Sequence, residues 1–311
     1  MSEAILEMIQ VTKKYGSVTV LTEISLQVAE KQILGLLGRN GAGKTTALNL
    51  MTGYFPPTKG KIRIAGRDMM EDPRACKRRI GYLPERPPLY DELTVEEYLC
   101  FVSELREVVQ KDIRRHTEEI MELCGLQEMR NRTLGRVSRG YRQRAGIAQA
   151  LCGDPEILIL DEPTVGLDPK QTAEMRGLIR KLGEEHTVIF SSHMLSEVQQ
   201  VCQRAAILKE GRLIRVLDLN DPEQGRLCLR IRAGIGGKAL REALEKLPCV
   251  EEIEIVSENN GESCARVLCR EDDGERAEDR IFRRMAETGA PIREMTPEKD
   301  TLEEIFLKET E

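Results

Sequence analysis

The stretch Gly38-Arg39-Asn40-Gly41-Ala42-Gly43-Lys44-Thr45 decides the fold of this chain, because it follows the pattern G-x-x-x-x-G-K-[ST]. The apolar run Ile33 to Leu37 before it predicts a buried strand, and Thr46 to Thr52 after it predicts a helix. Such a loop points backbone N–H groups at phosphate oxygens, and the helix adds the positive end of its dipole. We expect Lys44 to reach the β- and γ-phosphates and the Thr45 hydroxyl to bind Mg²⁺. The alternative is a glycine-rich turn without a ligand, which the preceding strand and the Lys-Thr pair disfavour.

Composition and charge indicate an ordinary globular chain. Its 311 residues are 40% hydrophobic and 32% charged, and no apolar run reaches the about 18 residues that a membrane-spanning helix needs. The nine cysteines are an odd number without a Cys-x-x-Cys pair, so we expect reduced thiols in a cytoplasmic chain. Residues 1–216 carry 32 Lys+Arg against 29 Asp+Glu, and residues 217–311 carry 15 against 24. Neither part has the strong basic excess of a nucleic-acid binder.

The first two hundred residues show two kinds of pattern around the glycine-rich loop. Short apolar runs within residues 4–36 predict strands of an antiparallel edge. From about residue 86 to residue 150 the spacing becomes helical, which predicts a helical insertion between strands. Thr94 and Glu97 match a capping box, so we expect a helix to begin there.

The remaining elements divide the chain into two domains. Buried strands at Ile157–Leu160 and Thr187–Ser191, each followed by a helix, predict a mostly parallel sheet covered by helices, and complete an α/β domain over residues 1–216. Residues 217–311 read strand, helix, strand, strand, helix, strand, an order that predicts a small α+β ferredoxin-like domain. A last helix is expected over Thr301–Lys308, capped by Asp300.

Two carboxylates and one imidazole are the candidate catalytic groups. The strand Ile157–Leu160 runs directly into Asp161 and Glu162. In phosphate-loop ATPases such a strand lies beside the one that feeds the loop, so Asp161 would hold Mg²⁺ and Glu162 would orient or deprotonate the attacking water. His193 follows the strand Thr187–Ser191 at its carboxyl end, where ligands of parallel sheets bind, and could contact the γ-phosphate. A histidine alone is more often structural.

Several separate motifs occur in the order typical of one family. Val137-Ser138-Arg139-Gly140-Tyr141-Arg142-Gln143-Arg144 is similar to the signature Leu-Ser-Gly-Gly-Gln, and Asp161-Glu162-Pro163-Thr164 with Gly166-Leu167-Asp168-Pro169 is similar to a Walker B strand and D-loop. Ser191-Ser192-His193 resembles the switch histidine, and Tyr15 matches the aromatic residue that stacks on adenine. Residues 1–216 therefore resemble the nucleotide-binding subunit of an ATP-binding cassette (ABC) transporter.

The resemblance implies an ATPase with a defined set of site residues. Catalysis would fall to Glu162, His193 and Lys44, and Mg²⁺ would be held by Thr45, Asp161 and Glu85. The implied nucleotide contacts are Tyr15, Val20, Gly38, Arg39, Asn40, Gly41, Ala42, Gly43, Lys44, Thr45, Thr46, Ser138, Gly140 and Asp168.

Two departures from the family pattern concern this site. The signature has Arg139 for the first family glycine and Tyr141 for the glutamine, although Ser138 and Gly140 keep the hydroxyl and the close backbone approach. Glu85 stands where the family has the Q-loop glutamine, which adds a negative charge near ATP. Both substitutions resemble the branch of ABC exporters with signatures of the Ser-Lys-Gly-Tyr type.

The resemblance also implies partners. Two subunits would stack head to tail around two ATP molecules, as a homodimer or with a related cassette, and would drive a separate integral membrane permease for efflux. The chain would then be cytoplasmic and peripheral on the inner face of the cell membrane, with no nucleic-acid partner. The alternative is a soluble ABC-type ATPase acting on the ribosome or on nucleic acid. Residues 217–311 would be a regulatory or dimerising module in a third interpretation.

Overall fold

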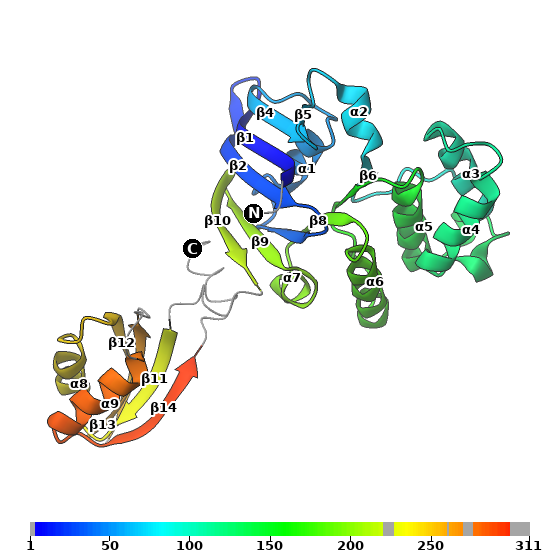
Figure 1. Cartoon of the computed structure of the whole chain (residues 1–311). Coiled ribbons are helices and arrows are strands. Elements are labelled where there is room, and N and C mark those ends of the chain that lie inside the picture. The colour runs from blue at the N-terminus through cyan, green and yellow to red at the C-terminus, as the bar shows by residue number, and fades with distance from the viewer. Residues whose placement is uncertain (1–3, 220–226, 260, 270–275, 299–311) are drawn as a thin grey trace. The chain divides into compact units, whose positions relative to one another are not determined.

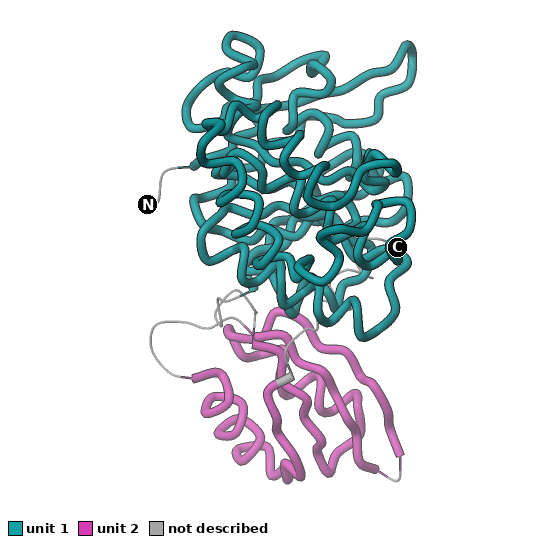
Figure 2. Tube along the Cα trace, turned by 90° about the vertical axis from the view of Figure 1, so that its right-hand side faces the viewer, with its two compact units in different colours: residues 1–220, 309–311 teal, residues 221–308 magenta. Residues whose placement is uncertain are grey.

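The computed structural model describes residues 4–219, 227–259, 261–269 and 276–298, which fall into two compact units (Figures 1 and 2). Residues 4–219 belong to the first unit and residues 227–298 to the second. The helix expected over residues 301–308 lies outside the described residues. The first unit continues beyond residue 216, because its last strand pairs with its neighbour as far as Asp218.

An antiparallel sheet forms one layer of the first unit, as the sequence predicts for residues 4–36. Its strand order is β2-β1-β4-β5 (Figure 1). The apolar runs before and after Glu23 belong to a single strand, because a bulge at this residue, where φ is 51°, interrupts the alternation without ending the pairing with β1. The bounds are β1 Ala4–Tyr15, β2 Val18–Ala29, β4 Lys59–Ile64 and β5 Arg67–Asp68.

A second, mostly parallel sheet carries the predicted strand-loop-helix segment. Its order is β10-β9-β3-β8-β7-β6, and only β10 runs antiparallel to its neighbour among these six strands. β6, β9 and β10 were not predicted from the sequence. The bounds are β3 Ile33–Leu37, β6 Ile80–Leu83, β7 Ile157–Leu160, β8 Thr187–Ser192, β9 Arg204–Lys209 and β10 Arg212–Asp218.

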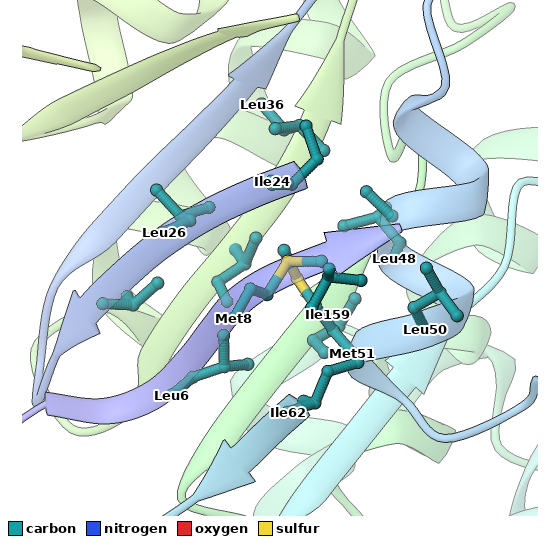
Figure 3. Close-up of a cluster of buried hydrophobic side chains, with 14 of the residues drawn as sticks. Leu6, Met8, Ile24, Leu26, Leu36, Leu48, Leu50, Met51, Ile62 and Ile159 are labelled. Carbon is teal, nitrogen blue, oxygen red and sulfur yellow. The ribbon is translucent and has the colours of Figure 1, made fainter. Parts of the chain in front are cut away.

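One apolar core of the first unit combines residues of both sheets, with α1 (Lys44–Met51) packed into it (Figure 3). Leu48 and Leu50 of this helix are buried against apolar residues of β1, β4 and β7. Burial of one such side chain contributes about 1.5–3 kcal/mol, so the packing of α1 fixes the position of the loop before it. The expected helix over residues 46–52 is therefore confirmed, and it begins two residues earlier.

Helices cover the parallel sheet and form a separate block beside it. The block consists of α3 (Val95–Leu105), α4 (Ile113–Cys124) and α5 (Arg139–Leu151), and α5 packs on β6. The capping box is confirmed, since the N–H of Glu97 donates to Thr94 Oγ1 at 3.2 Å and the N–H of Thr94 donates to Glu97 Oε2 at 2.9 Å. The other helices of the unit are α2 Pro73–Arg78, α6 Pro169–Leu182 and α7 Leu195–Val201.

The second unit has the predicted ferredoxin-like fold. Its elements follow the order strand, helix, strand, strand, helix, strand, and the sheet order β12-β13-β11-β14 places the third strand between the first and the second. All its strand pairs are antiparallel, and two helices contribute to its own apolar core. The bounds are β11 Leu227–Ala233, α8 Gly237–Leu244, β12 Val250–Asn259, β13 Glu262–Cys269, α9 Ala277–Glu287 and β14 Ile292–Glu298.

Candidate active site

The glycine-rich loop joins β3 to α1 in a conformation that its glycines make possible. Gly43 caps α1 with φ 101°, and a Cβ atom there would lie 2.6 Å from the side chain of Leu21. A Cβ atom at Gly38 would lie 2.7 Å from the carbonyl oxygen of Leu208. Lys44 is buried, and its Nζ donates to the carbonyl oxygen of Gly38 at 2.9 Å. The loop thus folds back so that its lysine crosses the start of α1.

Asp161 ends the neighbouring strand β7 in a buried position, with 1% of its surface exposed. Ser191 Oγ, from β8, donates to Asp161 Oδ1 at 2.6 Å, whereas Oδ2 has no hydrogen-bond partner among the described residues. Burial raises the pKa of the Asp161 carboxyl, and the hydroxyls of Ser191 and Thr45 partly oppose this rise. A buried carboxylate oxygen without a partner, close to a threonine hydroxyl, fits the oxygen donor set that Mg²⁺ prefers.

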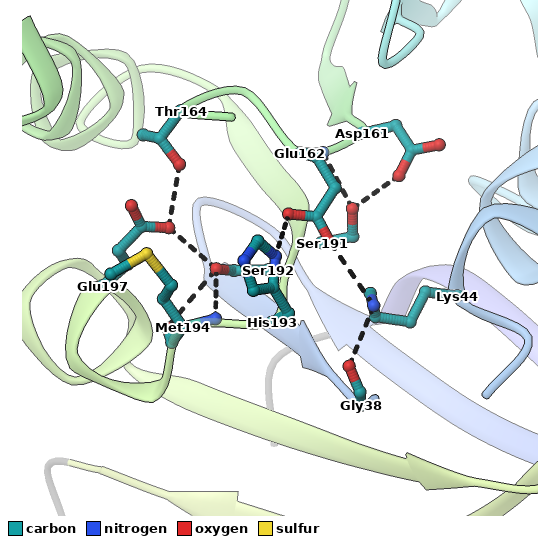
Figure 4. Close-up of polar contacts among 10 residues, drawn as sticks. All are labelled: Gly38, Lys44, Asp161, Glu162, Thr164, Ser191, Ser192, His193, Met194 and Glu197. Carbon is teal, nitrogen blue, oxygen red and sulfur yellow. Dashed lines mark hydrogen bonds and ion pairs between the residues drawn. The ribbon is translucent and has the colours of Figure 1, made fainter. Parts of the chain in front are cut away.

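Glu162 is held between a cation and an imidazole. Its Oε1 lies 3.3 Å from Lys44 Nζ and its Oε2 lies 2.8 Å from His193 Nδ1 (Figure 4). The backbone of Glu162 adopts the left-handed region, with φ 47°, and its N–H donates to Ser191 Oγ at 2.9 Å. Such a conformation is costly for a residue with a side chain and is found where surrounding contacts impose it. Three separate elements therefore bring Lys44, Glu162 and His193 together.

This arrangement can bind a polyphosphate and activate water beside it. The N-terminus of α1 and Lys44 supply positive charge, which favours anionic oxygens. Glu162 supplies a carboxylate that can accept a proton, and it is within 4 Å of the lysine that would meet the phosphates.

Glu85 also lies close to the candidate metal ligands. It lines one cavity of about 900 Å³ together with Thr45 and Asp161. Its negative charge adds to the rise in the pKa of Asp161, after the larger effect of burial. The structure thus brings all three expected metal ligands to the same cavity.

The signature residues lie in a different cavity. Ser138 and Gly140, at the start of α5, share it with Asp168, and all its lining residues fall within positions 125–175. In this structure the Ser138 and Asp168 side chains cap α5 and α6 respectively. The Arg139 guanidinium lies over Gly166 of the D-loop, since a Cβ there would be 2.2 Å from Arg139 Cζ. Within one chain these residues therefore line a cavity separate from the one that Thr45 and Asp161 line.

Tyr15 stands at the end of β1 with 43% of its surface exposed. Its ring meets Phe55 edge-on at 5.9 Å between centroids, and Lys13 Nζ lies 5.0 Å from the Tyr15 centroid. Lys13 Nζ also donates to the carbonyl oxygen of Pro56 at 2.8 Å. Val20, expected beside adenine, is half-buried on β2. Of the remaining loop residues, Ala42 is buried, Thr46 is half-buried, and the exposed ones are Arg39, Asn40, Gly41 and Thr45.

The hydrogen bonds of the hydroxyls and the carboxylate that surround the catalytic groups were not predicted from the sequence. Ser191 bridges Asp161 and the backbone of Glu162, and Ser192 and Thr164 both donate to Glu197. Helical spacing gives no signal for Glu197, because His193 precedes α7 and does not share its helical turn.

Comparisons with known proteins agree with this geometry. The sequence pattern of the ABC transporter family matches residues 21–165. The chain is 33% identical over 307 residues to the bacitracin transport ATP-binding protein BcrA of Bacillus licheniformis, which covers 98% of this chain and 96% of the relative. It is 38% identical over 221 residues to the bacitracin transport ATP-binding protein BcrA of Enterococcus faecalis, covering 70% of this chain and 71% of that protein.

Solved structures show the same fold. A dimeric ATP-binding cassette in a post-hydrolysis state, bound to ADP and Pi, aligns with TM-score 0.64 and 26% identity over 70% of this chain and 99% of that chain. CbiO1 from Clostridium perfringens, part of an ABC transporter complex, aligns with TM-score 0.66 and 23% identity over 79% of this chain and 97% of its own, a likeness of fold.

Fold and site together define a phosphate-loop ATPase with the ABC cassette architecture and an added ferredoxin-like unit. The chain belongs to the ABC transporter family, in which it is an ATP-binding and ATP-hydrolysing subunit. Within the residues that the structure describes, no helix combines the length and the apolar character needed to cross a membrane.

Proposed function

We propose that this chain hydrolyses ATP to drive a separate integral membrane permease that exports its substrate. The observation that carries the proposal is the position of Glu162 between Lys44 and His193, beside a loop shaped for phosphate. Two relatives whose names describe transport ATP-binding proteins support the link to a permease. The chain would work on the cytoplasmic side, peripheral to the inner face of the cell membrane.

The phosphates of ATP would lie in the loop of residues 38–46, with Lys44 reaching the β- and γ-phosphates. Thr45 and Asp161 would hold Mg²⁺, with Glu85 lining the same cavity. When bound, Mg²⁺ would neutralise charge on the phosphate oxygens. The support for this assignment is the Asp161 oxygen that has no partner among the described residues.

Glu162 would act as the general base. A water held by its carboxylate attacks the γ-phosphorus, and a new P–O bond forms as the bond to the β,γ-bridging oxygen breaks. The water proton passes to Glu162, and ADP leaves with the electron pair of the broken bond. ATP would displace Lys44 from its contact with Glu162, because the phosphates offer that lysine more negative charge. His193 would hold the freed carboxylate in place.

A second cassette would complete the site. Ser138, Gly140 and Asp168 lie apart from the loop of their own chain, so we assign them to the ATP of a partner cassette. An isologous arrangement of two identical chains closes with two-fold symmetry, and a related cassette could take the second place. Tyr15 would stack on adenine with Val20 beside it. Phe55 and Lys13, which contact the Tyr15 ring, would support it.

Purification of the tagged full chain from detergent-solubilised membranes of its host tests the permease. We expect mass spectrometry to identify a multi-span membrane protein at near-equal amount. The Glu162→Gln variant should retain the same protein, because binding of the permease does not require hydrolysis. Soluble partners alone would contradict the permease. Ribosomal material or nucleic acid would favour the alternative of a soluble ABC-type ATPase, which the charge balance of both halves already disfavours.

A further inference from the structure

A buried carboxylate lies next to the catalytic groups without belonging to them. Glu197 sits in the first turn of α7 with 2% of its surface exposed. Its Oε2 accepts hydrogen bonds from Ser192 Oγ at 2.7 Å and from Thr164 Oγ1 at 2.8 Å (Figure 4). Ser192 is the last residue of β8, and Thr164 lies in the segment that follows β7.

The two hydroxyls flank the two groups assigned to water activation. Thr164 stands two residues after Glu162, and Ser192 directly precedes His193. The Ser192 hydroxyl donates to Glu197 Oε2, the closer of its two possible acceptors. Its oxygen also accepts the N–H of Met194 at 2.9 Å. This closes a tight turn around His193, so the direction of the imidazole depends on the position of the Ser192 hydroxyl.

Burying the Glu197 carboxylate costs free energy, and the stability of the fold does not require a charge at this position. A buried charge is tolerated only when hydrogen bonds satisfy it, and apolar residues of similar volume stabilise a fold as well or better. The two hydroxyls meet this requirement at Oε2 of Glu197. A carboxylate can accept from two different segments at once, whereas an apolar side chain cannot fix the direction of either hydroxyl.

We propose that Glu197 is a positioning residue for ATP hydrolysis. It joins the loop after Glu162 to the turn that carries His193, and thereby keeps the His193 imidazole against the Glu162 carboxylate. The inference rests on the proposed roles of Glu162 and His193, and adds a residue that touches neither of them in this structure.

A double-mutant cycle on the full chain tests this coupling. We expect Glu197→Ala to lower kcat about tenfold with the KM for ATP changed by less than about twofold, because the loop that binds phosphate keeps its contacts. In the His193→Ala background the same substitution should have no further effect on kcat. Glu197→Gln, whose amide oxygen can still accept from both hydroxyls, should restore most of the loss.

Two further variants keep the test decisive. Val201→Ala shortens a buried side chain at the other end of α7, and should lower the melting temperature without changing kcat per folded molecule. If Glu197→Ala does not fold, Thr164→Val removes one hydroxyl at similar volume, and should lower kcat about threefold in the wild-type background only.

The outcomes separate the inference from the function beneath it. An equal loss of kcat from Glu197→Ala in both backgrounds, or no loss in the wild-type background, overturns the positioning role. If His193→Ala itself hydrolyses ATP at the wild-type rate, the role of His193 is wrong and the inference falls with it. If His193→Ala is slow and Glu197→Ala is not, the inference alone is overturned.

Discussion

The two units differ in whether they bury charged side chains. Among the described residues, every buried charged side chain lies in the first unit, and the one buried polar side chain of the second unit is Ser263. Burying a charge costs free energy, so groups of this kind mark places where chemistry or precise positioning requires them. The buried charged residues of the first unit are Lys13, Lys44, Asp161, Glu162 and Glu197.

The second unit is built as an ordinary packed domain. Residues such as Leu229, Leu240 and Ile281 form its apolar core, and the ion pair Arg232–Glu294 lies on the surface. Burial raises the pKa of the Cys269 thiol to about 12, so this cysteine is neutral and unreactive at physiological pH. The buried charged groups proposed for ATP hydrolysis thus lie in the first unit, whereas the described part of the second unit has an apolar core without a buried charge.

The largest expected effect comes from removing the buried cation. Lys44→Ala should lower ATP hydrolysis by about 10³-fold, because the phosphates lose a buried positive charge and Glu162 loses its partner. Phosphate release measures the change, and Lys111→Ala, at an exposed lysine, is the control. A loss smaller than about tenfold would mean that the buried charge is not part of the reaction.

A smaller effect is expected from pH at the metal ligands. Burial raises the pKa of Asp161, so protons compete with Mg²⁺ at pH values above the usual range of an aspartate. The apparent Mg²⁺ affinity should therefore fall as pH falls, by up to about tenfold per pH unit below that pKa. Mg²⁺ titration of nucleotide binding between pH 5 and 8 measures this.

The pH dependence of the free energy of unfolding has the opposite sign to that of the Mg²⁺ affinity. Without Mg²⁺ the folded chain holds the Asp161 proton more tightly than the unfolded chain does, because its folded pKa is raised. The stabilising contribution is full below the unfolded pKa and is lost as pH rises through the folded pKa. Asp161→Asn should remove both dependences, and an unchanged pH profile in that variant would assign them to another group.

Matched core substitutions sharpen the comparison further. Ile281→Ala in the second unit should lower the free energy of unfolding of that unit by about 2–5 kcal/mol, with ATP turnover within about twofold. Leu48→Ala in α1 should cost a similar free energy but also slow turnover, since this helix fixes the phosphate loop. Calorimetry and phosphate release measure the pair, and equal effects on turnover would remove the contrast.

The smallest effect is expected from removing the second unit. A chain of residues 1–220 keeps the whole core around α1 and should bind ATP within about twofold of the full chain. Isothermal titration with a non-hydrolysable ATP analogue, after a check of folding by circular dichroism, measures this. Loss of binding would show that the second unit contributes to the nucleotide site.

Much of the fold could be predicted, because its strongest signals are local. The strand-loop-helix segment from Ile33 to Thr52, the capping box at Thr94 and the strand before Asp161 all follow from adjacent residues. β6 was not predicted because Gly81 interrupts its short apolar run, and the reason for this glycine, a Cβ position 2.0 Å from the Ala150 carbonyl oxygen, is visible only in the folded chain. α2 was missed although its Asp-Pro start matches that of α6.

The candidate site could be predicted in its residue types but not in its geometry. Nothing near Glu162 in the sequence indicates a left-handed backbone that turns its carboxylate between Lys44 and His193. That turn depends on the neighbouring strands β3, β7 and β8, which meet only in the folded sheet. Glu197 was overlooked because an acidic residue in the first turn of a helix is ordinarily a surface feature.

The most direct test of the central claim is steady-state ATP hydrolysis by Glu162→Gln beside Glu184→Gln, an exposed glutamate of the same unit. We predict that Glu162→Gln hydrolyses ATP at least about 10²-fold more slowly while still binding it, because the amide cannot accept the water proton. Glu184→Gln should match the wild type. Hydrolysis by Glu162→Gln at the wild-type rate would contradict the assignment of the catalytic base.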